Sequence, residues 1–436
     1  MRFTYKSRSL SLAAWVVECI VEKRCDRPLG SNPPMDMDRD HMEPSGCFDY
    51  EYLKAAQETI FHLVYLLVCR VYFALQLVYR SFKNSAFIPS GHARVSAILF
   101  RHKRDPEEIS SIDDFVTIHE SFKSVNVLDE YWALYCVSNN YAVFVELPKP
   151  VTYYDSKRFP FCFVPFFEEA TRVAYVTIDD FIAYCDELGK KPQPRTILFT
   201  NTARCGSTLM ARMLSLEGVS TCFAEPYVLS NLSIGMIEGY YTQEFLKTLL
   251  PCVFTYLRKD VPSDQICVLK AASTEARLVP FTQGVTDLQH IFMFRKNGLA
   301  SVEKMLRRDR SMHFRMQIYN RSPYISNMLS WLFVGDGDFV RKLRPETLLE
   351  WAAIVYAAPY AHYLKNEDKY TGIVWYHDVV NDGGRTVAEL FEKGGTFLSR
   401  EALIGIKTTK PSAEQKRRFI EYCKVMEIPE SVLPGE

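Results

Sequence analysis

The chain has 436 residues, 48% of them hydrophobic and 14% aromatic, which is enough to bury a sizeable core in one large domain or two smaller ones. Its 52 basic and 52 acidic residues cancel, and a net charge of zero excludes a general attraction to nucleic acid. The 12 cysteines include no Cys-x-x-Cys pair and no histidines at zinc spacing. The sequence therefore predicts buried free thiols and no metal site.

The N-terminal half is predicted to contain two regions. Residues 1–58 mix both charges with Pro and Gly, a composition typical of partial disorder. Residues 59–190 are predicted to form an accessory α+β region with one apolar helix. Its expected strands are 131–137 and 142–147, joined as a hairpin, followed by 161–167 and 174–178.

The apolar helix of this region covers residues 60–79 and has the length of a membrane span. It contains Arg70, and an arginine near the centre of a span costs on the order of 3 kcal/mol. A buried or surface-docked helix is therefore favoured, and membrane association through 60–79 is the alternative. Buried thiols favour a cytoplasmic location over a Golgi membrane, which is kept as the second choice.

Residues 195–213, RTILFTNTARCGSTLMARM, predict a buried parallel strand, a polar turn at 201–206 and a helix capped by Ser207. This geometry binds phosphate, because free backbone N–H groups and the positive end of the helix dipole converge on one point. Arg204 adds a positive charge inside the turn. A Walker A loop would have Lys where this chain has Ser207, so the group that reaches the β- and γ-phosphates of ATP is missing.

The turn resembles the 5′-phosphosulfate loop of the sulfotransferases, in which a basic residue, a small residue, Gly and two Ser/Thr residues follow one another. The matching residues are Arg204, Cys205, Gly206, Ser207 and Thr208. The resemblance implies that these five residues bind the donor.

Two later segments resemble the same family. Arg295 ends an apolar strand and Ser301 lies in the next helix, which resembles the family's 3′-phosphate motif. The family usually has Arg-Asp/Asn-Pro and a Ser eight positions after the Arg, whereas here the Ser follows at six. Further on, Tyr376, His377 and Asp378 end a late strand where the family usually has Tyr-Glu-Asp.

The resemblance implies a donor, 3′-phosphoadenosine 5′-phosphosulfate (PAPS), used without a metal, and a small-molecule or carbohydrate acceptor. Arg204 would stabilise the leaving oxygen. Lys270 would either assist the leaving group or cap the strand that it ends. Small-molecule members use a His as base at the position of Ala272, whereas carbohydrate and tyrosine-protein members use a Glu after the first helix. Glu225 matches that Glu and is the predicted base.

The sequence thus predicts an α/β fold of the P-loop type, with a mostly parallel sheet and helices on both faces, preceded by a smaller α+β region. The P-loop domain would cover 195–436. Its strands are expected at 196–200, 219–223, 266–270, 290–294 and 372–376. Besides a sulfotransferase, two functions stay open: a nucleotide or small-molecule kinase, and a catalytically silent P-loop binding module.

Overall fold

The structure is a computed structural model that describes residues 45–82, 87–103, 108–295, 298, 301–302, 342–343, 348–393 and 395. Its packing divides the chain into two compact units, Met1–Tyr72 and Phe73–Glu436. Helix α2 (Ser45–Phe82) contains this boundary. Because α2 begins at Ser45, residues 45–58 are helical, and only 1–44 of the segment predicted to be partly disordered lie outside the described residues. The predicted domain boundaries stay predictions.

The larger unit contains a five-stranded parallel sheet with the strand order β10-β9-β6-β8-β7. All five predicted strands are present, and their ends differ from the predicted ones by two residues at most. Every residue of β8 is buried, as expected for a parallel strand covered on both faces. The strands are β6 (Arg195–Asn201), β7 (Ser220–Ala224), β8 (Ile266–Lys270), β9 (Leu288–Phe294) and β10 (Tyr370–Trp375).

Helices cover both faces of this sheet. Ile197 and Phe199 point to one face, where they pack against α5 (Ser207–Met213) and α13 (Tyr376–Lys393). Leu198 points to the other face and shares a core with α6 (Tyr227–Ile237) and α7 (Gln243–Arg258). The period-2 alternation of a strand explains this division. The predicted α/β class is therefore confirmed.

A second sheet precedes the parallel one and is antiparallel throughout, with the order β2-β1-β5-β4-β3. The predicted hairpin is confirmed as β3 and β4, and the run at 174–178 is confirmed as β5. Strands β1 and β2 were not predicted. The bounds are β1 (His92–Arg101), β2 (Phe115–Ser124), β3 (Trp132–Val137), β4 (Tyr141–Glu146) and β5 (Arg172–Thr177).

The strand predicted at 161–167 is wrong, because the segment forms the short helix α3 (Phe163–Glu168). A short apolar run has no periodicity that separates a buried strand from a buried helix. Pro165 lies in the first turn of α3, where its missing N–H costs no helical hydrogen bond.

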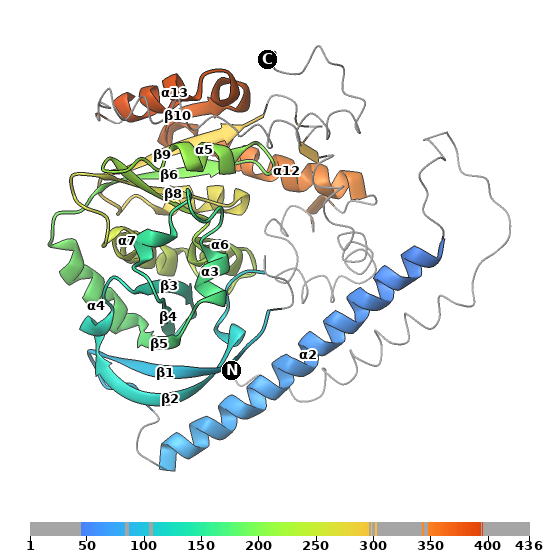
Figure 1. The fold of residues 1–436 in the computed structure, drawn as a ribbon, viewed down its shortest axis with the longest axis vertical. Helices are drawn as coiled ribbons and strands as arrows, with labels where there is room; N and C mark the ends of the chain where they lie inside the picture. Colours follow the sequence, from blue (N-terminus) through green and yellow to red (C-terminus); the bar gives the residue numbers. More distant parts are fainter. Residues whose placement is uncertain are drawn as a thin grey trace. The chain divides into compact units, whose positions relative to one another are not determined.

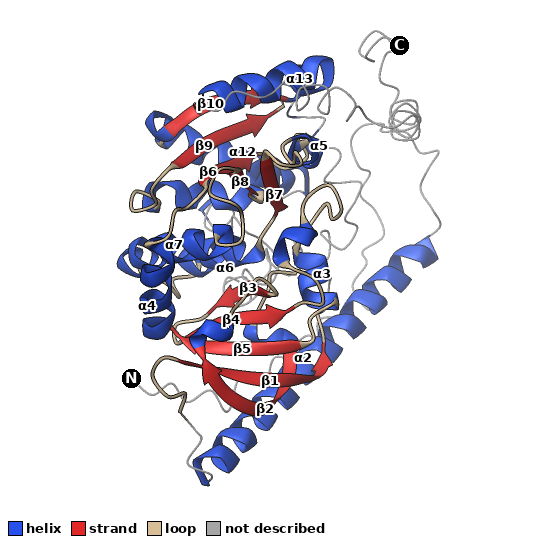
Figure 2. Cartoon of the chain, turned by 60° about the vertical axis from the view of Figure 1, so that its left-hand side comes forward, coloured by secondary structure: helices blue, strands red, loops and turns tan. Residues whose placement is uncertain are grey.

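The two sheets share one hydrophobic core. A single cluster joins Leu134 and Phe144 of the antiparallel sheet to Leu198 and Leu269 of the parallel sheet. Helices α6 and α7 lie between the two sheets (Figure 1, Figure 2). The Tyr256 hydroxyl on α7 donates a hydrogen bond of 2.8 Å to the carbonyl of Trp132 on β3. The accessory region therefore completes the core of the unit.

Among the described residues, one helical stretch, Ile60–Phe82, has the length and apolar composition needed to cross a membrane. This stretch is part of α2. Within the larger unit, the side chain of Gln76 on α2 donates to the carbonyl of Thr117 on β2, at 2.8 Å. The choice between a cytoplasmic and a Golgi location stays a prediction.

Replacing Tyr256 by Phe tests the shared core. The variant loses the bond to the Trp132 carbonyl and leaves that buried acceptor unpaired, so we expect the free energy of unfolding to fall by about 1–2 kcal/mol. Urea unfolding with an unchanged m-value measures the loss. Tyr131→Phe, at a more exposed hydroxyl nearby, is the control. Equal midpoints for the two variants would contradict the prediction.

Candidate functional site

The turn after β6 is held by its neighbouring strands in a strained conformation. The side-chain amide of Asn201 donates to the carbonyl of Ala271 at 2.7 Å, and the backbone N–H of Thr202 donates to the carbonyl of Met293 at 3.0 Å. Arg204 has φ +58° and Gly206 has φ +91°. A left-handed arginine persists only where its surroundings over-determine it, and such residues cluster at functional sites.

Helix α5 starts differently from the prediction. Gly206 is its N-cap residue, in the left-handed region, and Ser207 is its first helical residue. The N-cap prediction for Ser207 is therefore wrong. The physical reason is that the turn requires a positive φ immediately before the helix, which only Gly adopts at no steric cost.

Tyr376 joins the turn to the end of β9. A Cβ placed on Gly206 would lie 2.5 Å from the Tyr376 ring, so the ring packs directly on the glycine. The guanidinium of Arg295 lies 4.6 Å from the centroid of the same ring, in cation–π contact. Two predicted motifs about ninety residues apart in sequence thus meet through one aromatic ring. The sequence placed Tyr376 in a third motif, but nothing in it indicated this contact.

Ser301 and Tyr356 support the backbones of the two arginines. The Ser301 hydroxyl donates to the carbonyl of Arg204 at 3.4 Å, and Ser301 has an exposed fraction of 0%. The Tyr356 hydroxyl on α12 (Leu348–Lys365) donates to the carbonyl of Arg295 at 3.0 Å. Ser301, predicted together with Arg295 as part of the 3′-phosphate motif, contacts the backbone that carries Arg204, and its role in donor binding stays a prediction.

Glu225 and Lys270 form an ion pair at the same edge of the sheet. Glu225 follows β7, and Lys270 is the last residue of β8, the strand that lies between β6 and β7. The Lys270 side chain is 2% exposed and the Glu225 side chain 16%. The Lys270 ammonium also lies 5.7 Å from the ring centroid of Phe161, which comes from the accessory region.

The backbone of Glu225 differs from the expectation. An extended conformation is usual before a proline such as Pro226, but Glu225 has φ +56°. Its N–H donates to the carbonyl of Lys270 at 2.6 Å, which holds the carboxylate against the ammonium. Arg204 and Glu225 are thus both non-glycine residues in the left-handed region.

Cys205 and Thr208 complete the predicted donor loop. The Cys205 thiol is fully buried, and burial raises its pKa to about 11, against the opposing effect of Lys270. It therefore stays protonated at neutral pH, and only the backbone of Cys205 is placed to contact a ligand at the turn. Thr208 is partly exposed in the first turn of α5. No contact in the structure bears on its predicted role.

His377 and Asp378 follow Tyr376 on α13 and lie within 3.0 Å of each other, Nε2 to Oδ1. Both side chains are close to half exposed. Both side chains of this pair are more exposed to solvent than those of Glu225 and Lys270.

A buried carboxyl that the sequence analysis missed lies next to the ion pair. Glu275 is on η5 (Ser273–Phe281), with an exposed fraction of 0%. Its Oε2 accepts the N–H of Ala272 at 2.8 Å, and its Oε1 is hydrogen-bonded to the Ser230 hydroxyl. Burial raises the pKa of Glu275 to about 8, and Glu225 adds to the rise. The sequence offered no capping-box signature, because the cap residue is Ala272, which has no side-chain oxygen, and only the Glu half of the motif is present.

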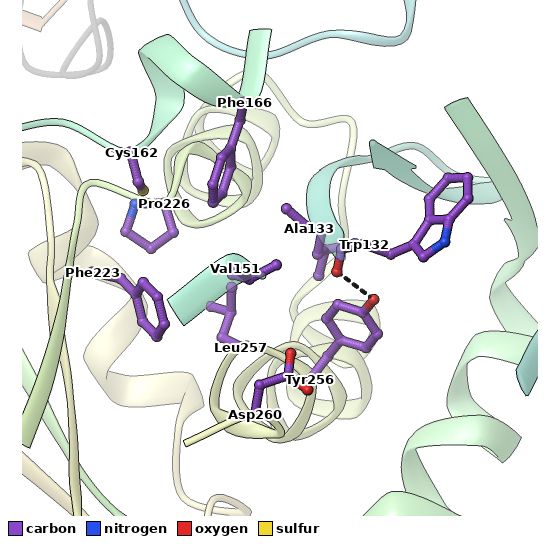
Figure 3. A pocket seen from close by; sticks show the side chains of 11 residues that line it. Trp132, Ala133, Val151, Cys162, Phe166, Phe223, Pro226, Tyr256, Leu257 and Asp260 are labelled. Atoms are coloured by element: carbon purple, nitrogen blue, oxygen red, sulfur yellow. Dashed lines mark hydrogen bonds between the residues drawn. The ribbon is translucent and has the colours of Figure 1, made fainter. Parts of the chain in front are cut away.

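A small cavity lies between the two sheets (Figure 3). Cys162, Phe223 and Pro226 line it on the side of the parallel sheet, and Tyr256 and Leu257 line it from α7. It has room for about one water molecule, so it is too small for a nucleotide or an acceptor.

No known protein-family model matches the chain, and no curated protein sequence matches it. Solved structures similar to this chain include two sulfotransferases. One is a sulfotransferase domain from the curacin biosynthetic pathway, with 12% identity, a TM-score of 0.30, and coverage of 49% of this chain and 77% of that one. The other is sulfotransferase STF9 from Mycobacterium avium, with 9% identity, a TM-score of 0.33, and coverage of 58% and 81%. Similarity this distant leaves the function to be decided by the site's own residues.

Replacing Gly206 by Ala tests the packing of the turn. The methyl group would meet the Tyr376 ring and would also force a side chain into positive φ, so we expect a loss of about 1–3 kcal/mol in the free energy of unfolding. Gly218→Ala is the matched control, because Gly218 has φ +73° with no atom within 4 Å of its Cβ position. Denaturant unfolding compares the two variants. A loss no larger for Gly206→Ala than for Gly218→Ala would show that the Tyr376 contact is loose.

Proposed function

We propose that this chain is a sulfotransferase, which moves a sulfuryl group from PAPS to a hydroxyl or amine of a small-molecule or carbohydrate acceptor. The observation that carries the proposal is the continuous contact from the Arg204 turn through Gly206 and Tyr376 to Arg295. It supports a site with two separate guanidinium groups, which fits a donor that is anionic at both its 5′ and 3′ positions.

The residues present suit such a donor better than they suit ATP. The turn lacks the Walker lysine, and α5 is only seven residues long, so the helix dipole alone supplies little charge. Arg204 and the N–H groups from Gly206 to Thr208 would hold the 5′-phosphosulfate. Arg295 would hold the 3′-phosphate, with Ser301 and Tyr356 fixing the backbones that carry the two arginines.

The proposed transfer needs no metal, because side chains supply the positive charge. The bond between sulfur and the bridging oxygen of the donor breaks as the bond between sulfur and the acceptor oxygen or nitrogen forms. Negative charge builds on the bridging oxygen, where Arg204 and Lys270 would stabilise it. The acceptor proton passes to Glu225. The products are adenosine 3′,5′-bisphosphate and the sulfated acceptor.

The ion pair gives Glu225 a second role in this proposal. Its carboxylate holds the buried ammonium of Lys270, and an unpaired buried charge is strongly destabilising. Glu225 is therefore proposed both as the base and as the partner that fixes Lys270. A substitution that keeps a hydrogen-bond acceptor for Lys270 separates the two roles.

Donor binding tests the proposal directly. Adenosine 3′,5′-bisphosphate at about 100 times its Kd should stabilise the chain by roughly 2.7 kcal/mol, measured by thermal unfolding. Arg295→Ala should weaken binding of this ligand far more than binding of adenosine 5′-monophosphate. Arg204→Ala should weaken both, because both carry the 5′-phosphate.

Two other results would replace the proposal. Stabilisation by ATP with Mg²⁺ but not by the bisphosphate would indicate a kinase. Stabilisation by neither would indicate a silent binding module. Equal weakening of both nucleotides by Arg295→Ala would show that Arg295 is structural.

Replacing Glu225 by Gln tests the base. Glutamine keeps the shape and an oxygen that can accept from Lys270, but it cannot take a proton. We expect turnover to fall by about two to four orders of magnitude, the usual contribution of general base catalysis, with nucleotide affinity near that of the wild type. Steady-state rates and calorimetric binding measure the two quantities. Turnover near the wild-type rate would remove Glu225 as the base and make His377 the next candidate.

A further inference from the structure

We propose that Glu275 is a positioning residue for the Lys270–Glu225 pair, and that the pair is competent only while Glu275 carries its proton. The inference deepens the proposed function and rests on it. Glu275 does not touch the reacting atoms in this scheme. It holds the turn that follows β8 in place. While it is protonated, it also adds no second negative charge beside Lys270.

The first support is the hydrogen bonding of Glu275. Its two oxygens join the N–H of Ala272, two residues beyond Lys270, to the Ser230 hydroxyl on α6. Both partners donate to Glu275, so these bonds hold the carboxyl in place in either charge state, while its complete burial favours the neutral form. The same junction carries a second bond, from the Ser233 hydroxyl to the carbonyl of Thr274 at 2.9 Å. Glu275 therefore fastens the end of β8 to α6.

The second support is the charge balance around Lys270. The titratable groups that face Glu275 are Glu225 from β7, Lys270 from β8 and Cys162 from the start of α3. Burial and the two glutamates hold the pKa of Cys162 well above its usual range, so this thiol stays neutral. One ammonium therefore balances one carboxylate, Glu225, as long as Glu275 is protonated.

The other elements packed on η5 leave this balance unchanged. Helix α6 contributes Ser230 and Ser233, which carry no charge. Helix α12 contributes Tyr363, which packs on Ala276 with the pKa of its phenol raised mainly by burial. Helix α7 meets η5 in the core cluster that contains Leu278.

Loss of the Glu275 proton would change the site in a defined way. Two carboxylates would then compete for one buried ammonium, and the local charge would change from zero to negative. A negative charge beside Lys270 opposes the charge that builds on the leaving oxygen and repels an anionic donor. The burial that raises the pKa of Glu275 to about 8 places this change just above neutral pH. The transfer rate should therefore be near its maximum at pH 7 and below, and fall as the pH rises through about 8.

The test compares rates between pH 6 and pH 9.5 for the wild type, Glu275→Gln and Glu217→Gln. The wild-type rate should fall roughly tenfold from its plateau by pH 9, since about one molecule in ten then keeps the proton. Glu275→Gln, neutral at every pH, should lose this fall. Glu217 is exposed, so Glu217→Gln should keep the wild-type profile. The same alkaline fall in Glu275→Gln would overturn the proposal.

A second measurement needs no turnover. In protein labelled with ¹⁵N-alanine, the amide of Ala272 should shift with pH around 8 in the wild type, because it donates to Glu275. It should not shift in Glu275→Gln. A wild-type amide that does not titrate would overturn the inference even if the Gln variant fails to fold. If no sulfuryl transfer were measured at any pH, that result would instead overturn the proposed function.

Discussion

The ion pair between Lys270 and Glu225 is the interaction on which the edge of the parallel sheet depends. Lys270 ends a strand that is buried along its whole length, so its charge is removed from water and must be paired. Glu225 meets it with a left-handed backbone, and burial raises the pKa of the neighbouring Glu275 carboxyl. Three ionisable residues are thus accommodated in one buried junction because each constrains the next.

The accessory region contributes to this junction as well as to the core. The segment before α3 runs along β7, the last strand of the parallel sheet. Its N–H groups at Ser156 and Cys162 donate to the carbonyls of Cys222 and Ala224, at 2.7 and 2.8 Å. These bonds cover an edge that would otherwise present unpaired carbonyls. They also bring Phe161 over Lys270, so the N-terminal half shields the ion pair from solvent.

Local sequence patterns predicted much of the fold, but they could not predict contacts between residues that lie far apart in the sequence. The five parallel strands could be predicted because each is a buried apolar run bounded by turn residues. Strands β1 and β2 were missed because their outward faces interrupt the apolar pattern, and α3 was mistaken for a strand because its run is short. At the site, the positions of Arg204 and Lys270 followed from the strand ends. The role of Glu275 did not, since its partner Ser230 is 45 residues away in sequence.

The left-handed backbone of Arg204 has an evolutionary consequence. A positive φ at a residue with a Cβ costs the native state on the order of 1 kcal/mol or more, and Gly would relieve that cost. A chain selected for folding alone would therefore drift toward Gly at this position and lose its guanidinium. Arg204 therefore keeps its guanidinium at a conformational cost that Gly206, two residues later in the same turn, does not carry.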